Sequence, residues 1–184
     1  MNDSPLTAAL LLCIDLQPVF IAAMADPAAI ERRCAFALAA AAGLGLRVAF
    51  TEQVPAKLGG TAPALRALAP TAPVWPKNTF SALADPTIRA ALEAQEIEHL
   101  LLCGIETSVC VFQTARDALA AGWQVTLLSD AVGARRPDDA RTCLDELARA
   151  GAHVLPTETV GYALLGDTTH PFFRAYTQLV KSHG

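Results

Sequence analysis

The chain has 184 residues, of which 53% are hydrophobic and 17% are charged, and its formal net charge is -4. This length suits one domain with a full core, so we expect a single domain over residues 1–184. The charged fraction is below the roughly 25% typical of soluble domains, which favours a homo-oligomer that buries part of its surface. The acidic balance argues against nucleic acid as a partner, because nucleic-acid binders usually carry a basic face.

The five cysteines are odd in number and include no C-x-x-C pair, which fits neither a disulfide framework nor a zinc ribbon. They are typical of reduced thiols in a cytosol. The apolar run over residues 6–14 follows Asp3 rather than a basic region, and it is too short to span a bilayer. We therefore expect a cytoplasmic protein with no export signal and no membrane partner.

Short apolar runs alternate with longer amphipathic segments along the chain. In chain order, the sequence predicts a strand at 9–14, a helix at 27–42, strands at 47–51 and 73–75, a helix at 85–95, a strand at 99–103, a helix at 108–121, a strand at 124–128, a helix at 137–150 and a strand at 153–155, followed by shorter helices after Glu158 and Pro171. Such alternation is typical of strand-helix-strand units on a parallel sheet. The continuous apolar character of the strands indicates that helices cover both faces.

Ligands of open α/β sheets bind beyond the carboxyl ends of the strands, so the polar residues just after each predicted strand are the candidates for chemistry. They are Asp15, Glu52, Gln53, Lys77, Glu106, Cys110 and Asp130. Residues 52–72, which are rich in proline and glycine, form the predicted wall or lid of the site. Asp15, Lys77 and Cys110 stand out, because together they supply an acid, a cation and a nucleophile.

Cys110 falls in the first turn of the predicted helix, where free amide groups and the helix dipole favour a thiolate and lower the thiol pKa. It lies beside the apolar stripe formed by Val111, Ala115 and Ala118 rather than on it. The alternative is that Cys110 is a small apolar filler, as most buried cysteines are. In the same way, Asp15 could be a turn or helix-cap residue and Lys77 a solvated loop lysine.

The sequence gives little support to a metal site or a dinucleotide site. The four histidines are scattered, without the spacing of metal ligands, so we expect no metal site. The G-x-G in residues 41–48 follows a predicted helix rather than a strand, which is the wrong context for a dinucleotide site. Arg135 and Arg136 could hold an anionic substrate or a neighbouring subunit, or could simply be solvated.

Several segments together resemble the isochorismatase-like cysteine hydrolases, and most closely the isochorismatase domain-containing proteins. These segments read LLCIDLQPVF, VAFTEQVPAKLGG, WPKNTFSAL, CGIETSVCVFQTARDAL, VTLLSDAVGAR and LLGDTTHPFF. The resemblance covers nearly the whole chain. It implies a three-layer α/β/α fold with a six-stranded parallel sheet in the order 3-2-1-4-5-6.

The resemblance also implies roles for individual residues. Cys110 would be the nucleophile, Asp15 the proton acceptor and later donor, and Lys77 the cation that keeps Asp15 ionised and supports the thiolate. A cis peptide bond would join Ile105 and Glu106, and the backbone amides of Glu106 and Cys110 would form the oxyanion hole. The implied reaction is hydrolysis of a small amide or related C-N bond through a thioester, without a cofactor.

Differences from the family's sequence pattern reduce the range of expected substrates. The metal-binding D-x-H pair of the nicotinamidase branch is absent from residues 51–57, which read TEQVPAK, so nicotinamide is not the expected substrate. Gln53 and Phe80 are the predicted pocket-lining residues, from loop placement and similarity. Two alternatives remain open, namely a vinyl ether hydrolase of the isochorismatase type and a non-catalytic binding protein that retains the fold.

Overall fold

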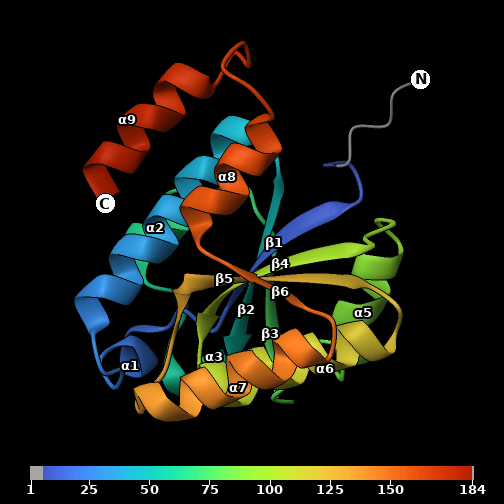
Figure 1. The fold of residues 1–184 in the computed structure, drawn as a ribbon. Helices are drawn as coiled ribbons and strands as arrows, with labels where there is room; N and C mark the ends of the chain where they lie inside the picture. The colour runs from blue at the N-terminus through green and yellow to red at the C-terminus, as the bar shows by residue number, and fades with distance from the viewer. Residues whose placement is uncertain (1–5, 184) are drawn as a thin grey trace.

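The computed structural model describes residues 6–183 and contains the predicted six-stranded parallel sheet, in the order β3-β2-β1-β4-β5-β6 (Figure 1). The strands are β1 Ala9–Ile14, β2 Arg47–Gln53, β3 Val74–Lys77, β4 His99–Ile105, β5 Gln124–Gly133 and β6 His153–Leu155. The helices are α1 Pro18–Ile21, α2 Pro27–Leu44, α3 Pro55–Leu58, α4 Pro63–Arg66, α5 Pro86–Glu93, α6 Phe112–Ala120, α7 Pro137–Arg149, α8 Thr157–Leu165 and α9 Phe173–His183, and a π-helical turn, η1 Thr107–Val111, precedes α6.

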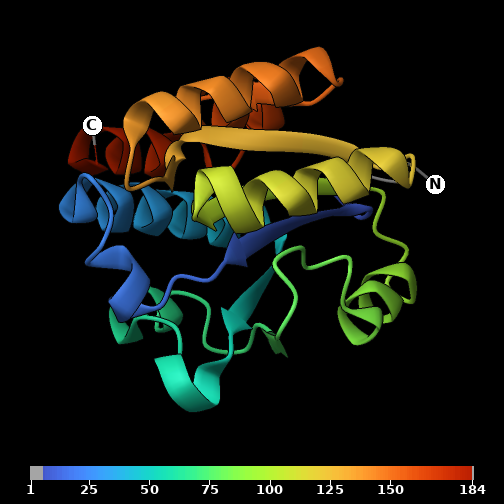
Figure 2. The same cartoon turned by 90° about the horizontal axis from the view of Figure 1, so that it is seen from below.

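Helices cover both faces of the sheet, so the fold is the predicted three-layer α/β/α sandwich. Figure 1 shows α2, α8 and α9 on one side and α5, α6 and α7 on the other. Figure 2, the view from below, shows α6 and α7 side by side, in agreement with their contacts. Among the described residues, no helix is both long and apolar enough to cross a membrane.

The side chains of β1 alternate between the two apolar layers of the core. Leu11 and Cys13 pack into the layer under α2, whereas Leu10, Leu12 and Ile14 pack into the layer under α5, α6 and α7. All of them are buried. Because burying one such leucine contributes about 1.5–3 kcal/mol, this central strand is a firm base for the residues at its carboxyl end.

Asp-Pro pairs fix the starts of two helices. Asp26 caps α2 by accepting a hydrogen bond from the Ala29 amide, and Asp85 caps α5 by accepting from the Thr87 amide. In each case a proline follows as the first helical residue, where its fixed φ suits the helix and its missing N–H costs nothing. Such a cap contributes about 1 kcal/mol.

Asp130 has a structural role rather than the expected place at the ligand-binding edge. It lies within β5, where its Oδ1 accepts hydrogen bonds from the Thr157 amide at 2.8 Å and from the Thr157 hydroxyl at 2.7 Å. Its Oδ2 accepts from Arg33, whose guanidinium also donates to the His183 carbonyl. Burial raises the pKa of Asp130, but Thr157 and Arg33 outweigh it and hold that pKa below its usual range. Asp130 thus joins α2, α8 and α9 to the sheet.

Several boundaries differ from the predicted ones, since β2 continues to Gln53, β3 to Lys77 and β4 to Ile105. Strand β5 continues to Gly133, and Asp130 within it is hydrogen-bonded to Thr157 instead of ending the strand. The segment over residues 52–72 is not a plain loop, since the short helices α3 and α4 lie within it. Each of these helices begins with a proline.

Candidate active site

The site lies at the carboxyl ends of β1, β2, β3 and β4, where the strand order reverses between β1 and β4. Asp15 follows β1 and Lys77 ends β3, and the Lys77 Nζ lies 2.7 Å from the Asp15 Oδ2. Both side chains are buried, with exposed fractions of 0% for Lys77 and 1% for Asp15. A buried ion pair of this kind persists only when further hydrogen bonds satisfy both partners.

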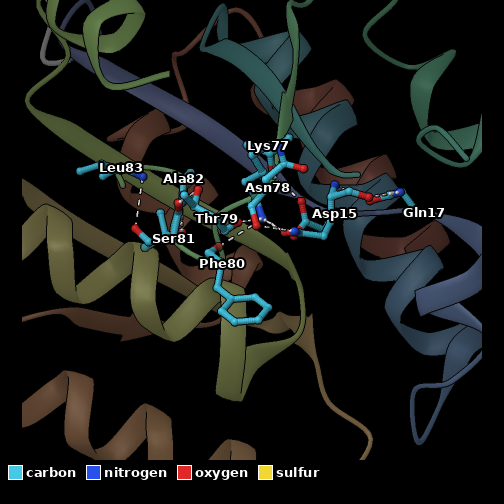
Figure 3. A network of polar contacts seen from close by, with 12 residues as sticks. Asp15, Gln17, Lys77, Asn78, Thr79, Phe80, Ser81, Ala82 and Leu83 are labelled. Atoms are coloured by element: carbon cyan, nitrogen blue, oxygen red, sulfur yellow. Dashed lines mark hydrogen bonds and ion pairs between the residues drawn. The ribbon is translucent and has the colours of Figure 1, made fainter. Parts of the chain in front are cut away.

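Lys77 has such additional partners. Its ammonium donates to the Gln53 side-chain oxygen at 2.6 Å and to the carbonyls of Thr79 and Phe80 at 3.2 Å each. Figure 3 shows Lys77 and Asp15 pointing toward one another, while the ring of Phe80 is turned away from them. Its four oxygen acceptors keep Lys77 in place and saturate its three protons.

Asp15 is held by both its side chain and its backbone. Its Oδ1 accepts a hydrogen bond from the Thr51 hydroxyl at 2.8 Å, and its amide donates to the Thr51 carbonyl at 3.1 Å. Its φ is +51°, in the left-handed region that aspartate and asparagine tolerate better than most residues. This geometry aims the carboxylate into the site instead of along the strand.

The β4–η1 turn brings Cys110 to the same place. At its start, Gly104 has φ +117°, and a Cβ there would lie 2.1 Å from the Ile14 carbonyl oxygen, so only glycine allows β4 to pass so close to β1. The Ile105–Glu106 peptide bond, predicted to be cis, is cis. Cys110 then lies in the π-helical turn η1, not in the first turn of a plain α-helix.

The sequence prediction of a low thiol pKa was wrong. Burial and the negative charge of Asp15 raise the pKa of Cys110 to about 12, and the positive charge of Lys77 only partly offsets them. The cysteine is 8% exposed, so little water reaches the sulfur. At neutral pH the resting site therefore contains a thiol beside a carboxylate, which can accept its proton.

A cavity of about 290 Å³ opens above these groups. It is lined by Asp15, Phe20, Ala23, Met24, Gln53, Phe80, Ile105, Glu106, Val109, Cys110 and Arg135. The lining thus includes both predicted pocket residues, Gln53 and Phe80. Lys77 is not part of it, because it lies behind Asp15. Arg136, the neighbour of Arg135, is instead paired with Asp139 at an exposed position.

Sequence reasoning missed two supporting residues, Thr51 and Gln17. The Gln17 side chain donates to the carbonyls of Gln53 at 3.1 Å and Gly59 at 2.6 Å, and it accepts from the Gln53 amide at 2.7 Å. It therefore fixes the end of β2 to the chain after β1. Thr51 and Gln17, like Asp15, are polar residues at the end of an apolar run, and this feature of the sequence could have indicated them.

The other candidates have different roles. Glu52 accepts hydrogen bonds from the Thr61 amide and hydroxyl and so holds the segment after β2 in place. Cys13, Cys34 and Cys103 are fully buried in the core. Among the described residues, no group of three histidine, cysteine, aspartate or glutamate side chains is arranged to hold a metal ion.

Residues 9–159 match the isochorismatase domain, which is more than half of the chain. The chain belongs to the isochorismatase family. Its relatives place it in the isochorismatase domain-containing subgroup.

Among relatives, isochorismatase domain-containing protein 2 of Bos taurus is 38% identical over 141 residues, which cover 75% of this chain and 66% of that protein. Isochorismatase domain-containing protein 1 of Salmo salar is 34% identical over 139 residues, which cover 76% of this chain and 49% of that protein. The isochorismatase-family chain described here thus spans between about half and two thirds of these relatives.

Solved structures agree with this fold. The MAR1 ribonuclease from Caenorhabditis elegans has a TM-score of 0.88 and 31% identity, covering 95% of this chain and 90% of that one. The YcaC gene product of Escherichia coli, described as an octameric hydrolase of unknown specificity, has a TM-score of 0.84 and 22% identity over 97% and 94% of the two chains. Nicotinamidase from Bacillus subtilis has a TM-score of 0.72 and 22% identity, covering 80% of this chain and 99% of that one. The last two are likenesses of fold alone.

Proposed function

We propose that this isochorismatase-family hydrolase cleaves a small amide or related C-N bond, with Cys110 as nucleophile, Asp15 as general base and acid, and Lys77 as the cation that keeps Asp15 ionised. The observation that carries the proposal is the buried Asp15–Lys77 pair at the base of a cavity lined by Cys110. Both charges act on the thiol, one raising its pKa and the other lowering it. A nucleophile next to a positioned base is the arrangement that covalent catalysis requires.

In the proposed first half-reaction, the Cys110 sulfur attacks the amide carbonyl carbon while Asp15 accepts the thiol proton. The developing oxyanion is stabilised by the backbone amides of Glu106 and Cys110, and each such donor contributes about 2.7–4 kcal/mol to transition-state stabilisation. Asp15 then gives its proton to the departing nitrogen as the C–N bond breaks. A thioester on Cys110 and free ammonia or amine are the products of this half.

In the second half-reaction, Asp15 accepts a proton from water as the water oxygen attacks the thioester carbonyl. The C–S bond breaks, the proton returns to the sulfur, and the carboxylic acid leaves. Lys77 takes no part in the proton transfers, and its hydrogen bonds to Gln53, Thr79 and Phe80 hold it beside Asp15. The proposed chemistry uses side chains of this chain alone and no cofactor.

The nicotinamidase likeness is in keeping with amide chemistry but does not identify the substrate. Vinyl ether hydrolysis of the isochorismatase type is an alternative in which Asp15 acts and the thiol does not. The relative from Caenorhabditis elegans is described as a ribonuclease, yet a cavity that presents the carboxylates of Asp15 and Glu106 does not favour a phosphodiester. We therefore propose a small-molecule substrate and no nucleic acid. A homo-oligomer and a cytoplasmic location remain proposals.

The test is a panel of small primary amides with detection of released ammonia, run beside Cys110→Ala and Asp15→Asn. Under the proposal, both substitutions lower the rate by at least about 100-fold, since each removes a group that takes part in bond making. Turnover that persists in Cys110→Ala would favour the vinyl ether alternative. If no amide releases ammonia with the parent protein, the proposed amide chemistry fails.

A further inference from the structure

The mouth of the cavity carries one pair of opposite charges, formed by Arg135 and Glu106. The Arg135 Nε lies 2.8 Å from the Glu106 Oε2, and the Arg135 amide donates to the Glu106 Oε1 at 3.3 Å. The Glu106 side chain is 15% exposed and that of Arg135 is 54% exposed. Glu106 is therefore the inner member of the pair, and the charge of Arg135 is already balanced before any ligand enters.

No other cation is available to a ligand in the cavity. Among the described residues that line it, Arg135 is the only one with a positive charge. Lys77 lies behind Asp15, and its protons are committed to oxygen acceptors. Among the described residues, the only positive charge that a substrate carboxylate could meet in the cavity is that of Arg135, which Glu106 already neutralises, and the carboxylate would also face the negative charges of Asp15 and Glu106.

Apart from the uncharged side chain of Gln53, the remaining wall is apolar. It consists of Phe20, Ala23, Met24, Phe80, Ile105 and Val109. These apolar side chains come from the segment after β1, the loop after β3, the end of β4 and the turn η1. At about 290 Å³, the cavity lies at the lower limit of the roughly 300–1,000 Å³ of ligand pockets, so it suits a small acyl group.

We infer that the cavity accepts uncharged amides of small apolar carboxylic acids and rejects amides whose acyl part carries a carboxylate, and that the Glu106–Arg135 pair sets this preference. The inference rests on the proposed amide hydrolysis and goes beyond it by naming the substrate class. Arg135 and the Glu106 side chain are then specificity residues. They choose the substrate, while Cys110, Asp15 and Lys77 carry out the reaction.

A matched pair of substrates tests the preference. In 4-methylpentanamide and succinamate an isopropyl group and a carboxylate of similar size occupy the far end of the same chain. We expect kcat/KM to be at least about 100-fold higher for 4-methylpentanamide, since juxtaposed like charges strongly disfavour the anionic compound. Equal values, or a preference for succinamate, would overturn the inference while leaving the proposed amide hydrolysis in place.

The matching aldehydes test binding without turnover. The Cys110 sulfur adds to the aldehyde carbon and the thiol proton passes to the carbonyl oxygen, which gives a hemithioacetal with no change in oxidation state. We expect 4-methylpentanal to protect Cys110 from alkylation at concentrations at least about 10-fold lower than succinic semialdehyde does. If this difference is found while no amide is hydrolysed, the pocket preference stands and the proposed function fails. Equal protection would count against the preference itself.

Variants of the charge pair identify the residues responsible. Glu106→Gln leaves the Arg135 guanidinium without a counter-ion, so the ratio of succinamate to 4-methylpentanamide turnover should rise about 10-fold. Arg135→Gln leaves the Glu106 carboxylate unpaired and should lower that ratio. Each ratio is measured within one protein, so a general loss of activity cancels. Arg136→Gln is the matched control, because Arg136 pairs with Asp139 outside the cavity. A ratio unchanged in both Glu106→Gln and Arg135→Gln would refute the assignment.

Discussion

Asp15→Asn should make the Cys110 thiol more reactive toward an alkylating reagent while it makes the enzyme less active. Asparagine has the shape of aspartate and tolerates the left-handed conformation that Asp15 adopts at φ +51°. The asparagine oxygen can accept from Lys77 in place of the Asp15 Oδ2, and its NH2 group can donate to the Thr51 hydroxyl, which accepts as well as donates. The substitution therefore removes a negative charge from the site with little change of shape.

The size of the effect follows from the charges around the sulfur. With a pKa of about 12, roughly one Cys110 thiol in ten thousand is ionised at pH 8. Two unit charges about 4 Å apart interact by about 4 kcal/mol at an effective dielectric of about 20, which corresponds to about a thousandfold in acid dissociation. Once Asp15 is neutral, the thiolate becomes the counter-ion of Lys77. Because a less basic thiolate is also less nucleophilic, we expect alkylation at pH 8 to become about 30- to 60-fold faster.

The assay follows iodoacetamide labelling of Cys110 by mass spectrometry. It is run in a Cys143→Ser background, because Cys143 is a partly exposed thiol whereas Cys13, Cys34 and Cys103 are buried. In the same preparation, amide hydrolysis should fall by at least about 100-fold, because the general base and acid is missing. The two readouts thus move in opposite directions, which a general loosening of the fold would not produce.

Thr51→Val is the control, since it removes a hydrogen bond to Asp15 but no charge. Its alkylation rate should stay within about threefold of the parent rate. Loss of one partner from a buried ion pair costs about 3–5 kcal/mol, so thermal melts must first establish that Asp15→Asn is folded at the assay temperature. If folded Asp15→Asn is alkylated no faster than the parent, Asp15 does not act on the thiol and the proposed mechanism is refuted.

Three further predictions concern pH and the backbone. In the parent protein, the rate of Cys110 alkylation should rise about tenfold per pH unit between pH 7 and pH 10 without a plateau, because the pKa of Cys110 is raised to about 12. A plateau near pH 8.5 would contradict this. Asp130 has a folded-state pKa below its unfolded value, so its stabilising contribution is present above about pH 4 and is lost as the pH falls through the folded pKa. Asp130→Asn should therefore lower the free energy of unfolding by about 3 kcal/mol at pH 7, measured with denaturant. Below pH 4 the variant should lose less stability than the parent protein does. Gly104→Ala should prevent folding, since its Cβ would lie 2.1 Å from the Ile14 carbonyl oxygen, whereas Gly122→Ala, at φ +83° with open space around it, should cost only about 1–2 kcal/mol in thermal unfolding.

The fold was predictable because its signals are local. The strands are continuous apolar runs, and the helices α2 and α5 begin at Asp-Pro pairs that are visible in the sequence. The prediction failed where tertiary partners decide. Strand β5 runs past Leu128, Asp130 within it finds partners on α2 and α8, and no local pattern around Asp130 indicates them.

The candidate site was predictable in its residue types but not in its electrostatics. Asp15, Lys77 and Cys110 follow strands whose carboxyl ends meet at one edge of a parallel sheet, so their convergence follows once the sheet order is given. The thiol pKa depends instead on burial and on the distance to a carboxylate from another strand. Burial and Asp15, neither of which is visible in the sequence around Cys110, raise that pKa, which is the opposite of the direction expected from the helix dipole.

The raised thiol pKa and the preference for uncharged substrates have one physical cause. With Cys110 protonated, the charges in and behind the cavity balance, since Asp15 is paired with Lys77 and Glu106 with Arg135. A resting thiolate or a substrate carboxylate would each add one unbalanced negative charge beside buried groups, and both are disfavoured for that reason. The proposed reaction avoids this cost, because Asp15 becomes neutral as it accepts the thiol proton while the substrate oxygen becomes negative. The negative charge then moves within the site, from the carboxylate to the oxyanion, and its total does not change.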